Sequence, residues 1–274
     1  MKIEDYPSQE PLSEVARGYH EGCLARRREE GIDIAYGADP YQRLNLFPAP
    51  RPDGRVLAFV HGGGWTNGYK EWMDFMAPAF TRAGVTFASI GYRLAPAFLF
   101  PTGPEDVAEG VMHLREIVAD HGGDPERLFL GGHSAGGHYA ALLATRTSWH
   151  RARGIAENPL RGCLPVSGVY DFGPSSALPM RPRFLGPPSD DVDRVASPLE
   201  GLERAPPFLI AFGERDFPHL KAQAAKMVQA LRERGGTVRQ IEFPGLDHFE
   251  ASYLAGDPDG IWVAEALRFM QDPS

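Results

Sequence analysis

The chain has 274 residues, 43% of them hydrophobic, which is enough to build one large core without duplication of a smaller unit. Its 36 acidic and 28 basic residues give a formal net charge of −8, which opposes non-specific binding to nucleic acid or anionic lipid. We therefore expect a single domain, residues 1–274, with a small molecule rather than nucleic acid or membrane as its partner.

The cysteines and the start of the chain both bear on its compartment. Cys23 and Cys163 are far apart and lack metal-ligand spacing, which suits a reducing compartment better than a disulfide framework. Residues 1–7 contain no apolar stretch like that of a signal peptide, and no later window approaches the ~20 apolar residues of a membrane span. We expect a soluble, cytoplasmic protein.

The first part of the chain differs in pattern from the rest. Residues 13–30 are charged and predict a helix, so that residues 1–33 form a helical extension of the domain. Residues 34–47 alternate between apolar and polar side chains, as an edge strand or hairpin does. The expected role of both segments is architectural.

After residue 54 short apolar runs alternate with helical stretches, which is typical of β-α-β units and a parallel sheet. The runs expected to be buried strands are 56–60, 85–90, 128–130, 163–166, 208–212 and 237–243. The expected helices are 71–83, 104–121, 135–147, 218–234 and 260–271. The sequence therefore predicts an α/β fold with a mostly parallel central sheet flanked by helices.

Residues 171–207 interrupt this alternation. They are rich in Pro, Gly, Ser and Asp and have few periodic apolar residues. A long irregular segment inside a compact domain is usually functional or disordered. We predict that it is an insertion that covers the site as a cap or lid.

The strongest motif is Gly-His-Ser-Ala-Gly at 132–136, which follows one predicted strand and precedes a helix. The glycines permit a sharp turn that exposes Ser134 as a nucleophile, and the N–H of Ala135 would face the developing oxyanion. The competing interpretation is a serine that only caps a helix between packing glycines. Two further motifs favour the nucleophile.

One of these is His-Gly-Gly-Gly-Trp at 61–65, directly after the first core strand. Glycines let backbone N–H groups approach a substrate oxygen, so Gly63 and Gly64 are expected to complete the oxyanion hole. A phosphate-binding loop is the alternative, but the segment lacks both the Lys-Ser/Thr ending of a P-loop and Gly-x-Gly-x-x-Gly spacing.

The other motif supplies a base late in the chain. His248 follows the last predicted strand, and Asp216 follows the strand before it, with Glu214 as the reserve acid. Asp247 is too close to His248 in sequence to be preferred. His248 would take the proton of Ser134 while Asp216 orients the imidazole, and this chemistry needs no metal and no organic cofactor. A metal-dependent hydrolase using His133 and His138 is a weaker alternative, because their spacing does not match a helical zinc site.

Together, 61–65, 132–138 and Asp-His-Phe-Glu at 247–250 resemble the kynurenine formamidase (arylformamidase) group of α/β-hydrolases. Ser-Gly-Val-Tyr-Asp at 167–171 and the stretch 36–44 are also similar to that group, and the resemblance covers roughly residues 36–253. It implies an α/β-hydrolase fold with Ser134, Asp216 and His248 as the triad.

A second resemblance is to hormone-sensitive-lipase-like esterases and feruloyl-esterase-type hydrolases, through Gly-Tyr-Arg-Leu-Ala-Pro at 91–96, Phe100-Pro101 and Asp106. The chain departs from the formamidase pattern at Gly64, where animal members tend to carry an aromatic residue. The departure leaves the substrate class open between a formamide and an ester.

An aryl formamide combines a small acyl part with a flat leaving group, so its pocket should be tight beside the nucleophile and aromatic farther out. The leading hypothesis is hydrolysis of an aryl formamide; the alternatives are a carboxylesterase and, more remotely, a non-catalytic ligand-binding member of the fold. Homodimer formation is left open. The residues expected to bind substrate are Gly62, Trp65, Tyr69, His133 and Phe249.

Overall fold

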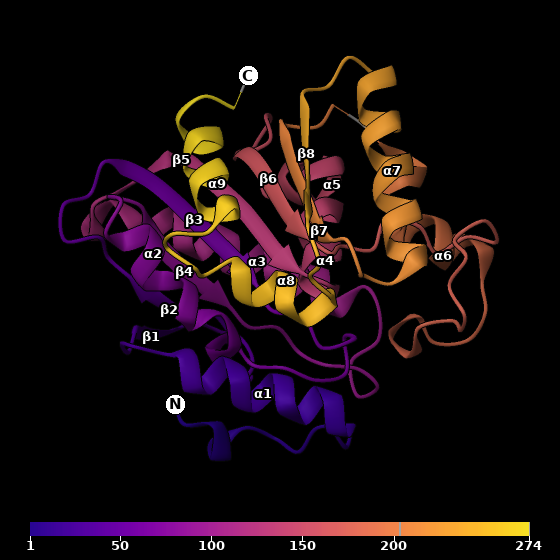
Figure 1. Ribbon diagram of the computed structural model, residues 1–274, viewed down its shortest axis with the longest axis horizontal. Helices are drawn as coiled ribbons and strands as arrows, with labels where there is room; N and C mark the ends of the chain where they lie inside the picture. Colours follow the sequence, from indigo (N-terminus) through magenta and orange to yellow (C-terminus); the bar gives the residue numbers. More distant parts are fainter. Residues whose placement is uncertain (203, 274) are drawn as a thin grey trace.

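An eight-stranded sheet forms the centre of the computed structural model, which describes residues 1–202 and 204–273 (Figure 1). The strand order is β1-β2-β4-β3-β5-β6-β7-β8. The pairs β1–β2 and β2–β4 are antiparallel, whereas β3 to β8 all run parallel to one another. The strands are β1 Ile32–Ala35, β2 Arg43–Phe47, β3 Gly54–Val60, β4 Thr86–Ile90, β5 Gly123–His133, β6 Leu160–Val166, β7 Phe208–Gly213 and β8 Val238–Phe243. The predicted parallel sheet is confirmed, and the alternating stretch 34–47 belongs to the hairpin of β1 and β2.

The central strands are buried on both faces, which explains their continuous apolar runs. In β3, Val56, Ala58 and Val60 face one core and Leu57 and Phe59 face the other. Helices α3, α4 and α7 cover the first face, and α1, α2, α8 and α9 cover the second. The helices are α1 Glu14–Arg26, α2 Ala77–Thr81, α3 Thr102–Ile117, α4 Ala135–Thr145, α5 Ser148–Arg151, α6 Asp190–Ala196, α7 Pro218–Glu233, α8 His248–Leu254 and α9 Ile261–Gln271. Within the described residues, no helix combines the length and apolar character that crossing a membrane requires.

The helix expected over residues 71–83 is replaced by the 3₁₀ helix Lys70–Met76 followed by the short α2. Every residue of this 3₁₀ helix is buried, including Lys70, Glu71 and Asp74. The charged residues bond to partners inside the protein, so this segment has no polar face toward solvent. A surface helix with one apolar and one polar face, as the sequence pattern predicts, therefore does not form here.

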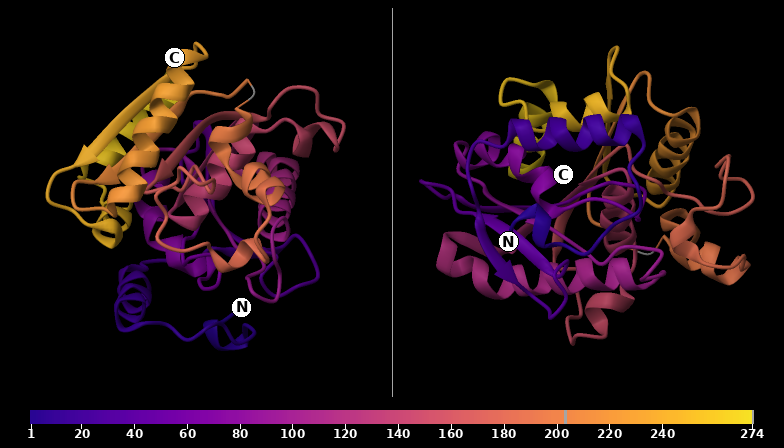
Figure 2. Two further views of the ribbon diagram at one scale, coloured as in Figure 1. Left: turned by 90° about the vertical axis from the view of Figure 1, so that its right-hand side faces the viewer. Right: turned by 90° about the horizontal axis from the view of Figure 1, so that it is seen from below.

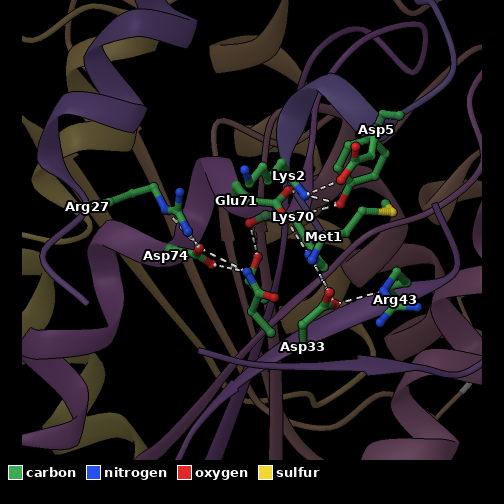
Figure 3. Close-up of polar contacts among 12 residues, drawn as sticks. Met1, Lys2, Asp5, Arg27, Asp33, Arg43, Lys70, Glu71 and Asp74 are labelled. Atoms are coloured by element: carbon green, nitrogen blue, oxygen red, sulfur yellow. Dashed lines mark hydrogen bonds and ion pairs between the residues drawn. The ribbon is translucent and has the colours of Figure 1, made fainter. Parts of the chain in front are cut away.

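A buried charged cluster joins this 3₁₀ helix to the N-terminal segment (Figure 3). The Lys70 ammonium pairs with Glu71 and lies 3.4 Å from a carboxylate oxygen of Asp33. Asp33 also pairs with the N-terminal ammonium group and with Arg43. The cluster therefore fastens the first residues of the chain to the β1–β2 edge of the sheet.

Replacing Lys70 with methionine is expected to destabilise the protein by about 3–5 kcal/mol. The side chain is only 1% exposed, so the variant leaves the buried Glu71 carboxylate without its ammonium partner. Chemical unfolding measures the loss, with Arg268→Met as the control, because the Arg268–Glu265 pair is more exposed and worth at most about 1 kcal/mol. Equal free energies of unfolding for the two variants would contradict the prediction.

Residues 171–207 are more ordered than their composition indicates. They include the 3₁₀ helix Arg183–Leu185, helix α6 and the 3₁₀ helix Pro198–Gly201. Phe184 and Leu185 are buried, whereas Met180 is 73% exposed. The apolar residues were too few and too irregularly spaced to predict these short helices, which depend on contacts with distant parts of the chain.

Candidate active site

Ser134 occupies the sharp turn between β5 and α4. Its φ of 53° and ψ of −115° lie in a region that costs an ordinary residue about 1–3 kcal/mol. A Cβ at Gly132 would lie 2.3 Å from the Gly136 backbone, and one at Gly136 would lie 2.1 Å from the Val60 carbonyl oxygen. The glycines are therefore required for the turn that raises Ser134 at the carboxyl edge of the sheet.

Three side chains form a continuous hydrogen-bonded chain at this edge. His248 Nε2 lies 3.0 Å from Ser134 Oγ, and His248 Nδ1 lies 2.8 Å from Asp216 Oδ1. A carboxylate only accepts hydrogen bonds, so Nδ1 carries the proton and Nε2 has a free lone pair for the serine proton. The structure thus brings together the predicted nucleophile, base and acid from β5, α8 and the end of β7.

Asp216 is held in its ionised form. Burial raises the pKa of Asp216, but the hydrogen bond from His248 and its electrostatic attraction for the carboxylate, together with the Ser167 hydroxyl and the Phe217 N–H, lower that pKa below its usual value. The Asp216 side chain is fully buried. A negative charge fixed here stabilises the imidazolium that forms when His248 takes a proton.

The other acids near the site have structural roles. Asp247 caps α8 by accepting hydrogen bonds from the N–H groups of Phe249 and Glu250. Glu214 accepts a hydrogen bond from the Gly245 N–H and fixes the loop before α8. His248 is the first residue of α8, a helix that was not predicted because it spans only seven residues.

Ala135 and Gly62 lie beside the nucleophile. Ala135 is the first residue of α4, so its N–H is one of the helix donors without an intrahelical acceptor. A Cβ at Gly62 would lie 3.1 Å from the Ser134 Cβ, which places the glycine loop directly against the nucleophile. Ala135 can therefore donate to an oxyanion next to Ser134.

Gly63 and Gly64 have positive φ angles, of 110° and 61°. A Cβ at Gly63 would lie 2.1 Å from the Asn67 carbonyl oxygen, whereas one at Gly64 would meet nothing within 4 Å. Gly64 is exposed and faces open space. The loop therefore leaves room for a substrate at Gly64, and the contribution of the Gly63 and Gly64 N–H groups to an oxyanion hole stays a prediction.

The N-terminal segment holds this loop, which the sequence did not reveal. The Gln9 side chain donates to the Gly68 carbonyl at 2.8 Å and accepts from the Gly68 N–H at 2.8 Å. Asn67 donates to the Glu10 carbonyl, and the Glu10 carboxylate pairs with Arg183 from segment 171–207. Nothing in the local sequence marks Gln9, because its partner is 59 residues away.

His133 supports the base instead of facing a substrate. Its side chain is 1% exposed and its Nε2 lies 2.9 Å from the His248 carbonyl oxygen, to which it must donate. Its Nδ1 lies 3.5 Å from the hydroxyl of Tyr19, which bonds Ser252 at 2.7 Å. The predicted substrate contact of His133 is therefore corrected, because the ring is buried between α1 and α8, which lie side by side in Figure 2.

We expect His133→Ala to lower kcat by about 10–100-fold with little change in KM, because small misplacement of a reacting group costs rate. His133→Gln, whose amide can still donate to the His248 carbonyl, should recover part of the loss. Steady-state kinetics on an ester check both variants. A rise in KM with kcat unchanged would argue that His133 contacts the substrate instead.

His61, at the start of the glycine loop, is a buried neutral histidine. Burial lowers the pKa of His61 to about 4, although its hydrogen bond to the Gly62 carbonyl raises the pKa slightly. In the unfolded chain the imidazole takes a proton near its ordinary pKa of 6.5. The stability present above pH 6.5 is therefore lost as the pH falls from 6.5 toward 4, by about 1.4 kcal/mol per pH unit.

His61→Gln should accordingly make the decline of unfolding free energy between pH 6.5 and 4.5 shallower, whatever its effect at neutral pH. Denaturant unfolding at a series of pH values measures the slope. His113→Gln is the control, because His113 lies near the surface and its imidazole is 32% exposed. An unchanged slope in His61→Gln would contradict the buried neutral state.

Two further aromatic residues lie next to the His248 ring. Phe217 is 46% exposed with its ring 4.9 Å from the His248 ring, and the half-buried Phe249 is 5.4 Å from it. Phe249 thus lies beside the base, and its contact with substrate stays a prediction. Phe217 was missed although it directly follows Asp216. Tyr69 packs against Tyr6, His20 and Trp72, so the structure does not bring it to the nucleophile.

Two other observations bear on the class of site. In residues 1–202 and 204–273 no three His, Cys, Asp or Glu side chains gather in a way that could hold a metal ion. Trp65, which follows the glycine loop, is 8% exposed and is part of an aromatic cluster described below. The arrangement as a whole can carry out proton transfer and nucleophilic attack with its own side chains.

Comparisons with known proteins agree with this geometry. A family model described as alpha/beta hydrolase fold matches residues 57–251. Esterase LipQ of Mycobacterium tuberculosis (strain ATCC 25618 / H37Rv) is 31% identical over 270 residues, covering 90% of this chain and 63% of LipQ. The chain therefore spans less than two thirds of that relative.

A kynurenine formamidase of Salmo salar is 25% identical over 251 residues, covering 87% of this chain and 81% of the relative. Among solved structures, an esterase of Pyrobaculum calidifontis superposes with a TM-score of 0.76 at 20% identity, covering 94% of this chain and 92% of that one. Both resemblances expected from the motifs, to formamidases and to esterases, are confirmed.

Proposed function

Because the chain belongs to the alpha/beta hydrolase family, we propose that it is a serine carboxylesterase that uses Ser134, His248 and Asp216. The predicted fold class is confirmed by this membership. The observation that carries the proposal is the hydrogen-bonded chain from Ser134 Oγ through the imidazole to Asp216, at a serine held in a strained turn.

In the proposed reaction Ser134 Oγ attacks the ester carbonyl carbon while His248 Nε2 takes the serine proton. The oxyanion accepts hydrogen bonds from backbone N–H groups of Gly63, Gly64 and Ala135. The carbon–oxygen bond to the alcohol then breaks, and His248 gives its proton to the departing oxygen. Water, deprotonated by His248, attacks the acyl-enzyme and releases the carboxylic acid and the free serine.

Esters are better supported than the aryl formamide that the motifs first suggested. The relative LipQ is named an esterase and is 31% identical, whereas the kynurenine formamidase is 25% identical. Formamide hydrolysis remains the second candidate, since the formamidase matches most of both chains. An ester also has the better leaving group, so the same machinery should act on it more easily.

The test compares hydrolysis of p-nitrophenyl acetate and N-formylkynurenine by the purified protein and by Ser134→Ala at neutral pH. Ester turnover that is lost in the variant is the expected result. Preference for the formamide by orders of magnitude would replace the esterase proposal with formamide hydrolysis. Equal activity of the variant would refute the role of Ser134.

A further inference from the structure

Four buried aromatic side chains meet one helical turn beyond the nucleophile. The Trp65 ring stacks on Phe184 with centroids 4.2 Å apart, and Phe172 lies 5.7 Å from Trp65 and 5.5 Å from Phe184. His138, whose N–H bonds the Ser134 carbonyl, has its ring 5.6 Å from Phe184. The cluster thus combines the glycine loop, helix α4 and segment 171–207.

His138 fixes the position of Trp65 through a defined tautomer. His138 Nε2 lies 2.8 Å from the Ala196 carbonyl oxygen, so it must carry the proton. Nδ1 is then free to accept the Trp65 Nε1–H at 3.1 Å. Burial lowers the pKa of His138 to about 3, which keeps this pattern throughout the neutral range. One imidazole therefore ties the end of α6 to the glycine loop.

The chemistry of the reaction decides which part of a substrate faces this cluster. The leaving oxygen must lie near His248 Nε2 to receive its proton, so we place the alcohol beside the imidazole, next to the exposed ring of Phe217. The acyl chain leaves the carbonyl carbon in another direction. Trp65 directly follows the oxyanion-hole glycines, and its ring partners include none of the rings around His248.

We propose that Trp65 and Phe184 form the closed end of the acyl subsite, which limits the enzyme to esters of short acids such as acetate and butyrate. The inference rests on the proposed esterase function and adds to it the acyl class and the residues that set it. Phe184 is 1% exposed and Trp65 is 8% exposed, so the stacked rings are covered by the rest of the chain, and a longer acyl chain could extend past them only by displacing a ring. Segment 171–207 thereby acts as a wall that determines specificity.

The test measures kcat/KM for p-nitrophenyl acetate, butyrate and octanoate in the wild type, Phe184→Leu and Phe184→Ala. The wild type should prefer the two short esters. Removing ring volume should raise the octanoate-to-acetate ratio by about tenfold or more, since each methylene accommodated in an apolar pocket changes kcat/KM by about 10–200-fold. Phe184→Leu keeps the assay usable if Phe184→Ala does not fold.

Phe80→Leu is the matched control, because Phe80 is fully buried in the other core, against Phe87 and Trp262. It should lower stability and leave the chain-length preference unchanged. Two results would contradict the proposal that Trp65 and Phe184 limit the acyl chain, while leaving the esterase proposal intact. One is a folded Phe184→Leu protein with the wild-type octanoate-to-acetate ratio, and the other is a wild type that accepts octanoate as well as acetate. A wild type inactive on all three esters would instead overturn the proposed function.

Discussion

We expect Ser134→Ala to lower kcat for an ester by about 10⁶-fold, because it removes the atom that would form the acyl-enzyme. Residual hydrolysis then comes from binding and from the oxyanion hole, which leave a rate about 10³–10⁴-fold above that of water. The measurement is the initial rate on p-nitrophenyl acetate with both proteins at matched, high concentration, so that the small residual rate can be resolved.

Ser148→Ala is the control for Ser134→Ala, since Ser148 is exposed at the start of α5 and contacts none of the three proposed catalytic side chains. It should retain full activity. Ser134→Ala should also fold with a stability within about 1–2 kcal/mol of the wild type, because it removes only the hydrogen bond between Ser134 Oγ and His248 Nε2. A loss of less than about tenfold in Ser134→Ala would contradict the nucleophile assignment.

Asp216→Asn is expected to lower kcat by about 10⁴-fold with little change in KM. The carboxylate accepts the proton on His248 Nδ1, at 2.8 Å, and so leaves Nε2 free for Ser134. An amide can donate to Nδ1, which moves the imidazole proton to Nε2 and blocks its role as base. Steady-state kinetics at neutral pH measure the effect.

Glu214→Gln is the matched control for Asp216→Asn. It makes the same chemical change two residues away, and the Gln side chain can still accept from the Gly245 N–H. Its kcat should stay within a few fold of the wild type. Equal losses in the two variants would mean that the acid of the site has been misassigned.

The three proposed catalytic residues could be found from the sequence because each follows a predicted strand. Parallel strands end at one edge of the sheet, so side chains just after β5, β7 and β8 are brought together by the fold itself. Ser134, Asp216 and His248 all lie at such positions. Local pattern and sheet topology therefore carry enough information for this part of the site.

The residues that hold the site could not be found in the same way. His133 stands next to Ser134 in sequence and was expected to contact substrate, but its partner is the His248 carbonyl, 115 residues away. Gln9 hydrogen-bonds to Gly68, and Phe184 stacks on Trp65, and each of these pairs is also far apart in the sequence. Such contacts depend on how separate segments pack, and no short motif records them.

Covalent labelling is the most direct test of Ser134 as the nucleophile of an ester hydrolase. The full chain is treated with a p-nitrophenyl alkylphosphonate, and the intact mass and the modified peptide are determined. We predict one equivalent of adduct on Ser134, much slower formation in Asp216→Asn and none in Ser134→Ala. An unlabelled wild-type protein, or an adduct on another residue, would contradict the account.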